Sequence, residues 1–140
     1  MLKSAALAAQ RAMRGWFEVD GQDEVATPSD ETASFRLRFG DLEVADLTLE
    51  KGIWEFQYTD SFRRQLSKGG VQPLIDFPDA NRAYRSQHLW PFFVARIPSV
   101  AQPRVQEEIV RRGLDQTSAP QLLKAFGERS ISNPFVLQSA

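Results

Sequence analysis

Three side chains near the middle of the chain are of the types that perform acid–base chemistry or bind cations. His88 is the single histidine, and Asp76 and Asp79 flank Pro78. An imidazole can act as a general base, but beside aromatic residues at an expected helix start we interpret His88 as a packing or capping residue. Two carboxylates in a turn can bind a cation, although turn carboxylates usually accept hydrogen bonds from the local backbone.

The remaining sequence contains no recognisable catalytic arrangement. It has no phosphate-cradling glycine loop, nucleophile elbow, paired-histidine motif or kinase catalytic loop. The absence of cysteine excludes disulfides and thiolate chemistry and, with one histidine, leaves no soft-ligand metal site. We therefore predict that the protein is not an enzyme, that it has no catalytic, cofactor or metal residues, and that it acts by binding.

Size and charge limit the kind of partner. A chain of 140 residues with 42% apolar residues can bury the core of one domain. Its net charge of −1 lacks the basic footprint of a nucleic-acid binder, so direct nucleic-acid binding is not expected. No apolar run approaches the ~20 residues of a membrane helix, and the polar residues near the start interrupt any signal peptide. We expect a cytoplasmic protein that does not associate with membranes.

The first quarter of the chain differs in composition from the rest. Residues 1–17 are rich in helix formers and predict an N-terminal helix. Residues 18–33 contain six carboxylates and no basic residue, which indicates an acidic, mobile linker or an acidic arm for a basic partner. Residues 34–140 then form the expected domain.

The beginning of this domain predicts an antiparallel β-meander. Residues 35–39 alternate apolar and basic side chains, and residues 53–59 are rich in strand formers. Between them, residues 42–49 continue the apolar pattern with a slip in parity near Ala45 and Asp46, which a β-bulge would repair.

Two further segments follow the meander. Asp60 or Ser61 can cap a short helical turn that ends at the Gly69-Gly70 pair. Residues 71–77 contain Pro73 and form at most an edge strand.

An aromatic run, residues 84–99, is expected to be the centre of the core. Trp90, Phe92 and Phe93 should be largely buried, and a helix should start close to Pro91 because proline fits the first helical turn.

A second helix should open at Pro103 and end at Gly113. Its predicted inward residues are Val105, Ile109 and Val110, with an outer pair of Glu107 and Arg111.

Capping-box spacing between Ser118 and Gln121 predicts a third helix that ends at Gly127. Residues 131–137 predict a last edge strand. The predicted fold class is therefore α+β: an antiparallel β-meander with a final edge strand, packed against two to three short C-terminal helices.

The order of these segments resembles the N-terminal subdomain of the HipA kinase toxins from about Phe35 to Leu137. The motifs that carry the resemblance are, in chain order, G-I-W-E-F-Q-Y, D-F-P, Y-R-S-Q-H-L-W-P-F-F-V-A-R-I-P and Q-L-L-K-A-F-G. In that family a proline closes the aromatic helix start, as Pro98 does here, and a leucine pair and a glycine recur, as Leu122, Leu123 and Gly127 do. The chain departs from the family after Pro98, where an acidic residue and a glycine are usual, and near Asn133, where a glycine and small residues are common.

The family's kinase machinery lies further along a much larger chain and is absent from this sequence. The resemblance therefore implies a free-standing copy of the subdomain, similar to the small HipS antitoxins that bind and restrain a separate kinase. The expected partner is a HipA-type Ser/Thr kinase toxin, and a helix-turn-helix repressor can belong to the same complex. HipS-type antitoxins can use a bulky aromatic residue just beyond the closing proline to obstruct the kinase site, and residues 100–102 contain none.

We predict that the proline-flanked loop between the first two C-terminal helices contacts this kinase. We expect Val100 and Arg104 to be exposed there. The predicted partner-binding residues are Ser99, Val100, Ala101, Gln102 and Arg104. The loop could equally be a simple helix connection, and the alternative function is a stand-alone scaffold or self-associating domain without a kinase partner.

Overall fold

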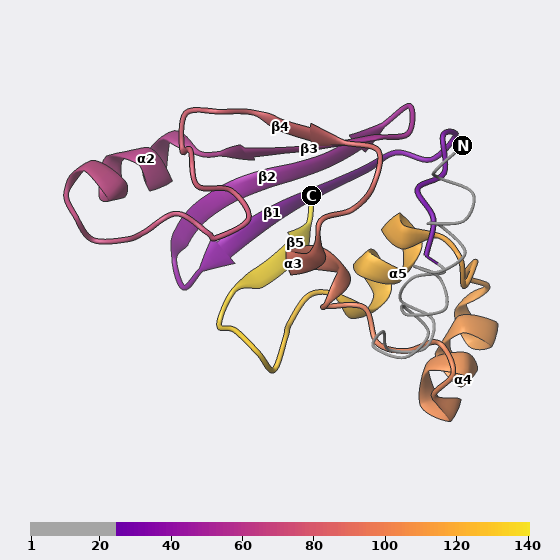
Figure 1. The fold of residues 1–140 in the computed structure, drawn as a ribbon. Helices are drawn as coiled ribbons and strands as arrows, with labels where there is room; N and C mark the ends of the chain where they lie inside the picture. The colour runs from indigo at the N-terminus through magenta and orange to yellow at the C-terminus, as the bar shows by residue number, and fades with distance from the viewer. Residues whose placement is uncertain (1–24) are drawn as a thin grey trace, which may run out of the picture.

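The computed structural model describes residues 25–140, which form a five-stranded antiparallel sheet with helices on one side and at one end (Figure 1). The strands are β1 (Ala33–Phe39), β2 (Leu42–Glu50), β3 (Ile53–Tyr58), β4 (Tyr84–Ser86) and β5 (Val136–Ser139). The helices are α2 (Asp60–Ser67), α3 (Pro91–Val94), α4 (Pro103–Arg112) and α5 (Ala119–Phe126). The strand order β4-β3-β2-β1-β5 confirms the predicted α+β meander with a final edge strand. The predicted helix in residues 1–17 and the start of the predicted linker lie outside the described residues.

Tight turns and one bulge set the register of the meander. Lys51 and Gly52 form a two-residue turn with φ angles of 52° and 77°, the positive values that match the twist of a β-hairpin. Leu37 pairs with Ala45, but the next residue of β1 pairs with Glu43, so Val44 is the extra residue of a bulge. The parity slip predicted near Ala45 is therefore confirmed, and the bulge lets both Val44 and Ala45 be buried.

The core lies between the sheet and the C-terminal helices. Phe35, Leu47 and Phe56 occupy one cross-strand row of the inner face. The ring of Phe77, from the loop between α2 and β4, stacks on Phe56 at a centroid distance of 3.7 Å, and Phe93 of α3 lies 6.0 Å from Phe56. Each such buried side chain contributes roughly 1.5–3 kcal/mol to folding.

The prediction for the aromatic run is only partly correct. Pro91 is the first residue of α3, as expected, and Phe93 is fully buried. Trp90 and Phe92, however, are only partly buried. Because α3 has four residues, a single helical turn directs one side chain fully into the core and leaves its neighbours at the edge.

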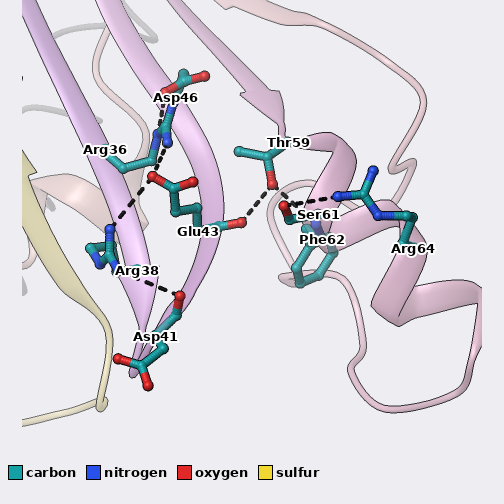
Figure 2. A network of polar contacts seen from close by, with 9 residues as sticks. All are labelled: Arg36, Arg38, Asp41, Glu43, Asp46, Thr59, Ser61, Phe62 and Arg64. Carbon is teal, nitrogen blue, oxygen red and sulfur yellow. Dashed lines mark hydrogen bonds and ion pairs between the residues drawn. The ribbon is translucent and has the colours of Figure 1, made fainter.

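The opposite face of the sheet is polar and carries an ionic network (Figure 2). Arg36 on β1 donates from Nε to Asp46 at 2.6 Å and from Nη1 to Glu43, and Arg38 lies 3.5 Å from the same Glu43 carboxylate. The hydrogen bond to Asp46 is the main reason that the pKa of Arg36 is raised. Partly exposed ion pairs of this kind stabilise a protein only weakly. We therefore expect this network to contribute little to the stability of the fold.

Thr59 connects this network to α2. Its hydroxyl donates to the carbonyl of Glu43 and accepts a hydrogen bond from the amide of Phe62 at 3.0 Å (Figure 2). Thr59 is therefore the N-cap of α2, and the prediction of Asp60 or Ser61 as the cap is wrong by one or two residues.

Two predicted strands are also corrected. Residues 71–77 form a loop, because the hydroxyl of Tyr58 bonds to the backbone of both Leu74 and Phe77; the edge strand on this side is β4 instead. The last strand starts at Val136, five residues later than predicted, because the preceding residues are held in a loop by Arg96.

The second half of the predicted acidic linker is attached to the domain. Ala26 exchanges backbone hydrogen bonds with Thr117 and Ala119, and the indole of Trp54 donates to Thr27 at 2.9 Å. The carboxylate of Glu31 accepts hydrogen bonds from two side chains at the start of α5. Residues 25–32 thus form part of the domain, although composition alone indicates a linker.

Candidate functional site

The predicted partner-binding loop lies between α3 and α4 and is fixed at its base. Ser99 and Val100 are buried, with exposed fractions of 7% and 8%. The hydroxyl of Ser99 accepts from the amide of Ala101 at 3.3 Å, and its carbonyl accepts from the amide of Gln102 at 3.2 Å. The expectation that Val100 is exposed is therefore wrong: Val100 is part of the core cluster and holds the loop in place.

Gln106, which the sequence analysis did not identify, ties this loop to two neighbouring segments. Its side-chain amide donates to the carbonyl of Val100 and to the side-chain oxygen of Gln116, just before α5, at 3.1 Å. Its backbone amide bonds to the carbonyl of Gln102 and begins the α4 ladder. The loop is consequently held at its start by burial and at its end by the first turn of α4.

The exposed part of this region continues along α4. Ala101, Gln102 and Arg104 are exposed, as are Glu107 and Val110 one and two turns further on. Val110 was predicted to point inward, but its exposed fraction is 78%, because the buried stripe of α4 consists of Val105 and Ile109 alone. We call this surface the Arg104 face; it comprises Ala101, Gln102, Arg104, Glu107 and Val110.

Charge pairing on α4 leaves Arg104 available. Arg111 donates to Glu108 at 2.7 Å instead of to the predicted Glu107, and this hydrogen bond lowers the pKa of Glu108 and raises the pKa of Arg111. Arg112 also lies within 3.9 Å of Glu108. Arg104 is exposed and makes no hydrogen bond or ion pair with any residue between 25 and 140.

Behind the loop lies a buried arginine that the sequence analysis also did not single out. Arg96 has an exposed fraction of 4% and donates to the carbonyls of Gly127, Glu128 and Phe135 at 2.6, 2.8 and 2.7 Å. A fourth donor bonds to the side chain of Asn133. Burial lowers its pKa. The signal in the sequence that could have indicated this role is a basic residue inside the apolar run F-F-V-A-R-I-P. A guanidinium in such a run can be buried at a low free-energy cost only when its donors are hydrogen-bonded.

The other chemistry-bearing residues serve the backbone or face solvent. Asp79 accepts a hydrogen bond from the nearby amide of Asn81, as expected of a turn carboxylate, whereas Asp76 accepts one from the amide of Phe92, 16 residues further along the chain. His88 is exposed and the N-cap of α3 is Trp90, so the interpretation of His88 as a packing or capping residue is wrong. No group of three or more potential metal ligands occurs in the part of the chain that the structure describes, and none of its helices is long and apolar enough to cross a membrane.

A cleft of about 680 Å³ separates the start of α5 from one end of the sheet. Its lining includes Phe35 and Leu49 at the base and Glu31, Glu50 and Lys124 among its charged groups. Glu31 is already bonded to Ser118 and Gln121, and the cleft brings together none of the predicted partner-binding residues.

In comparisons with known proteins, no family model matches the chain and no curated protein is significantly similar to it. The resemblance to the HipA subdomain therefore depends on the order of the sequence motifs alone. What the geometry itself defines is an α+β domain with a rigid, exposed loop-and-helix surface.

Proposed function

We propose that the protein is a non-enzymatic binding module that contacts a separate HipA-type Ser/Thr kinase through the Arg104 face and restrains it. The observation that carries this proposal is that the loop between α3 and α4 is anchored by burial at its start. Ser99 and Val100, its first two residues after Pro98, are buried. The residues that follow, Ala101, Gln102 and Arg104, are exposed. A surface that is already ordered loses little conformational entropy on binding, which favours association.

The chemistry of the Arg104 face suggests what it would contact. Arg104 offers a planar set of donors that suits a carboxylate or phosphate, and Val110, two turns along α4, offers an exposed apolar side chain. A kinase surface with an acidic or phosphorylated group beside an apolar depression would match both residues. No bulky aromatic lies on this face, so the proposed restraint acts by docking at the kinase surface and not by an aromatic plug.

The fold is consistent with the proposal. An antiparallel meander followed by short helices and a returning edge strand is the architecture that the resemblance implies. Within the segment after Pro98, Ala101, Gln102 and Arg104 lie at the surface. In this proposal the chain and the kinase meet in the cytoplasm, and a helix-turn-helix repressor can join the same complex.

Capture of a HipA-type kinase encoded beside this chain tests the proposal. Arg104→Glu reverses the charge of an exposed side chain in the first turn of α4, where a carboxylate is compatible with the helix dipole. We expect it to weaken capture at least about tenfold, equivalent to ~1.4 kcal/mol, and to restore the toxicity of the kinase.

Lys68→Glu is the matched control, because Lys68 is an exposed cation at the end of α2, on a different part of the molecule (Figure 1). It should leave capture unchanged. Equal capture by parent and Arg104→Glu, with both folded, would contradict the proposed contact.

A further inference from the structure

The register of the meander determines which backbone groups of its strands face which neighbour. In an antiparallel pair, a residue directs both its N–H and its C=O to the partner strand, and the next residue directs both away. The two-residue turn makes Glu50 and Ile53 a hydrogen-bonded pair, so Glu55, two residues further on, also faces β2. The amide of Thr59 bonds to the carbonyl of Val44 at 2.9 Å, as the same alternation requires.

This alternation leaves one residue of β4 with its backbone facing outward. Trp54 and Phe56 face away from β2 and toward β4, where they pair with Ser86 and Tyr84. Arg85 lies between these two residues, so its N–H and C=O point away from the sheet. Because β4 is the outermost strand on its side of the sheet (Figure 1), these two groups lie at an open edge.

Backbone groups that face outward elsewhere in the sheet have partners. The carbonyl of Tyr58, next along the same side of β3, accepts a hydrogen bond from Nη1 of Arg63 at 2.8 Å. On the opposite edge, the amide of Leu137 in β5 donates to the carbonyl of Glu128 at 2.8 Å. The outward N–H and C=O of Arg85, by contrast, bond to no residue between 25 and 140. An unpaired edge of this kind is a template for a further strand.

The edge is fixed at both ends of β4. The hydroxyl of Tyr84 accepts from the amide of Asp79 at 2.8 Å, and its ring contacts that of Phe77 at 5.2 Å. At the other end, the hydroxyl of Ser86 accepts from the amide of His88 at 3.0 Å and turns the chain away. Binding to a strand that is already ordered costs little conformational entropy.

Arg85 also determines the charge that this edge favours. Its side chain is 68% exposed and lies 3.7 Å from Glu55 on β3, but it forms no hydrogen bond with any residue between 25 and 140. A carboxylate directly opposite Arg85 is attracted and can accept from the guanidinium, whereas a like charge is repelled. Two copies of β4 that paired about Arg85 would set two guanidinium groups opposite each other. The edge therefore disfavours a second copy of this chain.

We propose that β4 is a docking edge for an extended segment of another protein, which joins the sheet beside Arg85 and places an acidic side chain opposite it. The backbone hydrogen bonds provide affinity, and the acidic side chain provides specificity. The Arg104 face lies on α4, away from β4 (Figure 1). The inference is therefore independent of the proposed kinase contact.

Hydrogen exchange of the full chain with a synthetic peptide tests this inference. The probe is a peptide with blocked ends, in which threonine and valine alternate around one central glutamate; its matched form has lysine in place of the glutamate. Without peptide, the amide of Arg85 should exchange quickly and those of Tyr84 and Ser86 slowly. The glutamate peptide should slow exchange at Arg85 and leave Leu137 unchanged. It should bind at least about threefold more tightly than the lysine peptide.

Three controls separate backbone pairing from charge. Methylation of the central amide nitrogen of the glutamate peptide removes the N–H that faces Arg85, and should abolish the slowing. Arg85→Thr keeps a strand former but removes the charge, so it should bind the glutamate and lysine peptides equally. Lys68→Thr removes an exposed cation at the end of α2 and should keep the preference of the parent.

Four outcomes would overturn the proposal. They are no slowing at Arg85 with millimolar glutamate peptide, equal binding of the methylated peptide, equal binding of the lysine peptide by the parent, and an undiminished preference in folded Arg85→Thr. Protection of Arg85 that appears without peptide and grows with the concentration of the chain would assign the edge to a second copy, and would also overturn it.

Discussion

The buried guanidinium of Arg96 donates a hydrogen bond to the side chain of Asn133, 37 residues further along the chain, at 3.1 Å. With three carbonyls bonded to the same group, Arg96 attaches the loop before β5 to the end of α3. Its acceptors within the described residues are all neutral, so the interaction stabilises one arrangement of these segments without a buried ion pair.

Arg96→Met should therefore be strongly destabilising. Methionine has a similar length but no donors, so it leaves several partly buried oxygens without partners, each at a cost of about 1–3 kcal/mol where water cannot enter. We expect a loss of at least about 3 kcal/mol in the free energy of unfolding, measured by urea denaturation. Arg96→Lys should recover little of it, because an ammonium cannot reproduce the planar fork. A loss below about 1 kcal/mol for Arg96→Met would show that the clamp is dispensable.

The two adjacent phenylalanines of α3 should differ in energetic importance. Phe93 is fully buried and contacts the central rings, whereas Phe92 is partly exposed. Phe93→Ala should cost about 3–5 kcal/mol, as removal of a buried aromatic typically does, and Phe92→Ala clearly less. Thermal unfolding of both variants under one set of conditions compares them, and equal losses would contradict the assigned burial.

The attachment of residues 25–32 predicts slow amide exchange at a place where composition alone indicates mobility. The amide of Ala26 bonds to Thr117 at 2.6 Å, and the amide of Ala119 bonds to Ala26 at 2.9 Å. Hydrogen exchange should be slower at Ala26 than at Asp30, which is exposed and whose amide makes no such bond to the part of the chain from residue 25 onward. Free exchange at Ala26 would indicate that this segment leaves the domain in solution.

Tyr58 predicts a loss of stability at high pH. Burial raises its pKa from 10.0 to about 12. A group whose folded pKa is raised contributes stability that is fully present below its unfolded pKa and is lost as the pH rises through the folded value. The free energy of unfolding should therefore fall between about pH 10 and pH 12.

Tyr58→Phe provides the comparison. It should be less stable than the parent at neutral pH, because Leu74 and Phe77 lose their partner. The free energy of unfolding of Tyr58→Phe should also fall less than that of the parent between pH 10 and about pH 12, because the variant lacks the titrating hydroxyl. If the free energy of unfolding of parent and variant fell in parallel with rising pH, Tyr58 would be excluded as the cause of the loss of stability.

Local patterns in the sequence predict much of this fold, and long-range contacts explain what they miss. The alternation around Phe35, the helix start at Pro91 and the parity slip near Ala45 each depend on neighbouring residues and are confirmed. The loop at residues 71–77 depends on Tyr58, which lies on another element, so no local pattern reveals it.

The same distinction applies to the candidate site. Two prolines mark the loop between α3 and α4, and the exposure of Arg104 follows from the apolar stripe of α4. The burial of Val100 and the contacts of Gln106 depend on the core cluster and on Gln116, which are brought close only by folding.

Hydrogen exchange of the chain with and without its kinase tests the central claim most directly. If the Arg104 face is the contact, addition of a purified HipA-type kinase encoded beside this chain should slow amide exchange in the loop after Pro98 and along α4, and leave β4 unchanged. Protection confined to the sheet or to the cleft beside α5, or no protection at all with a kinase that does bind, would contradict it.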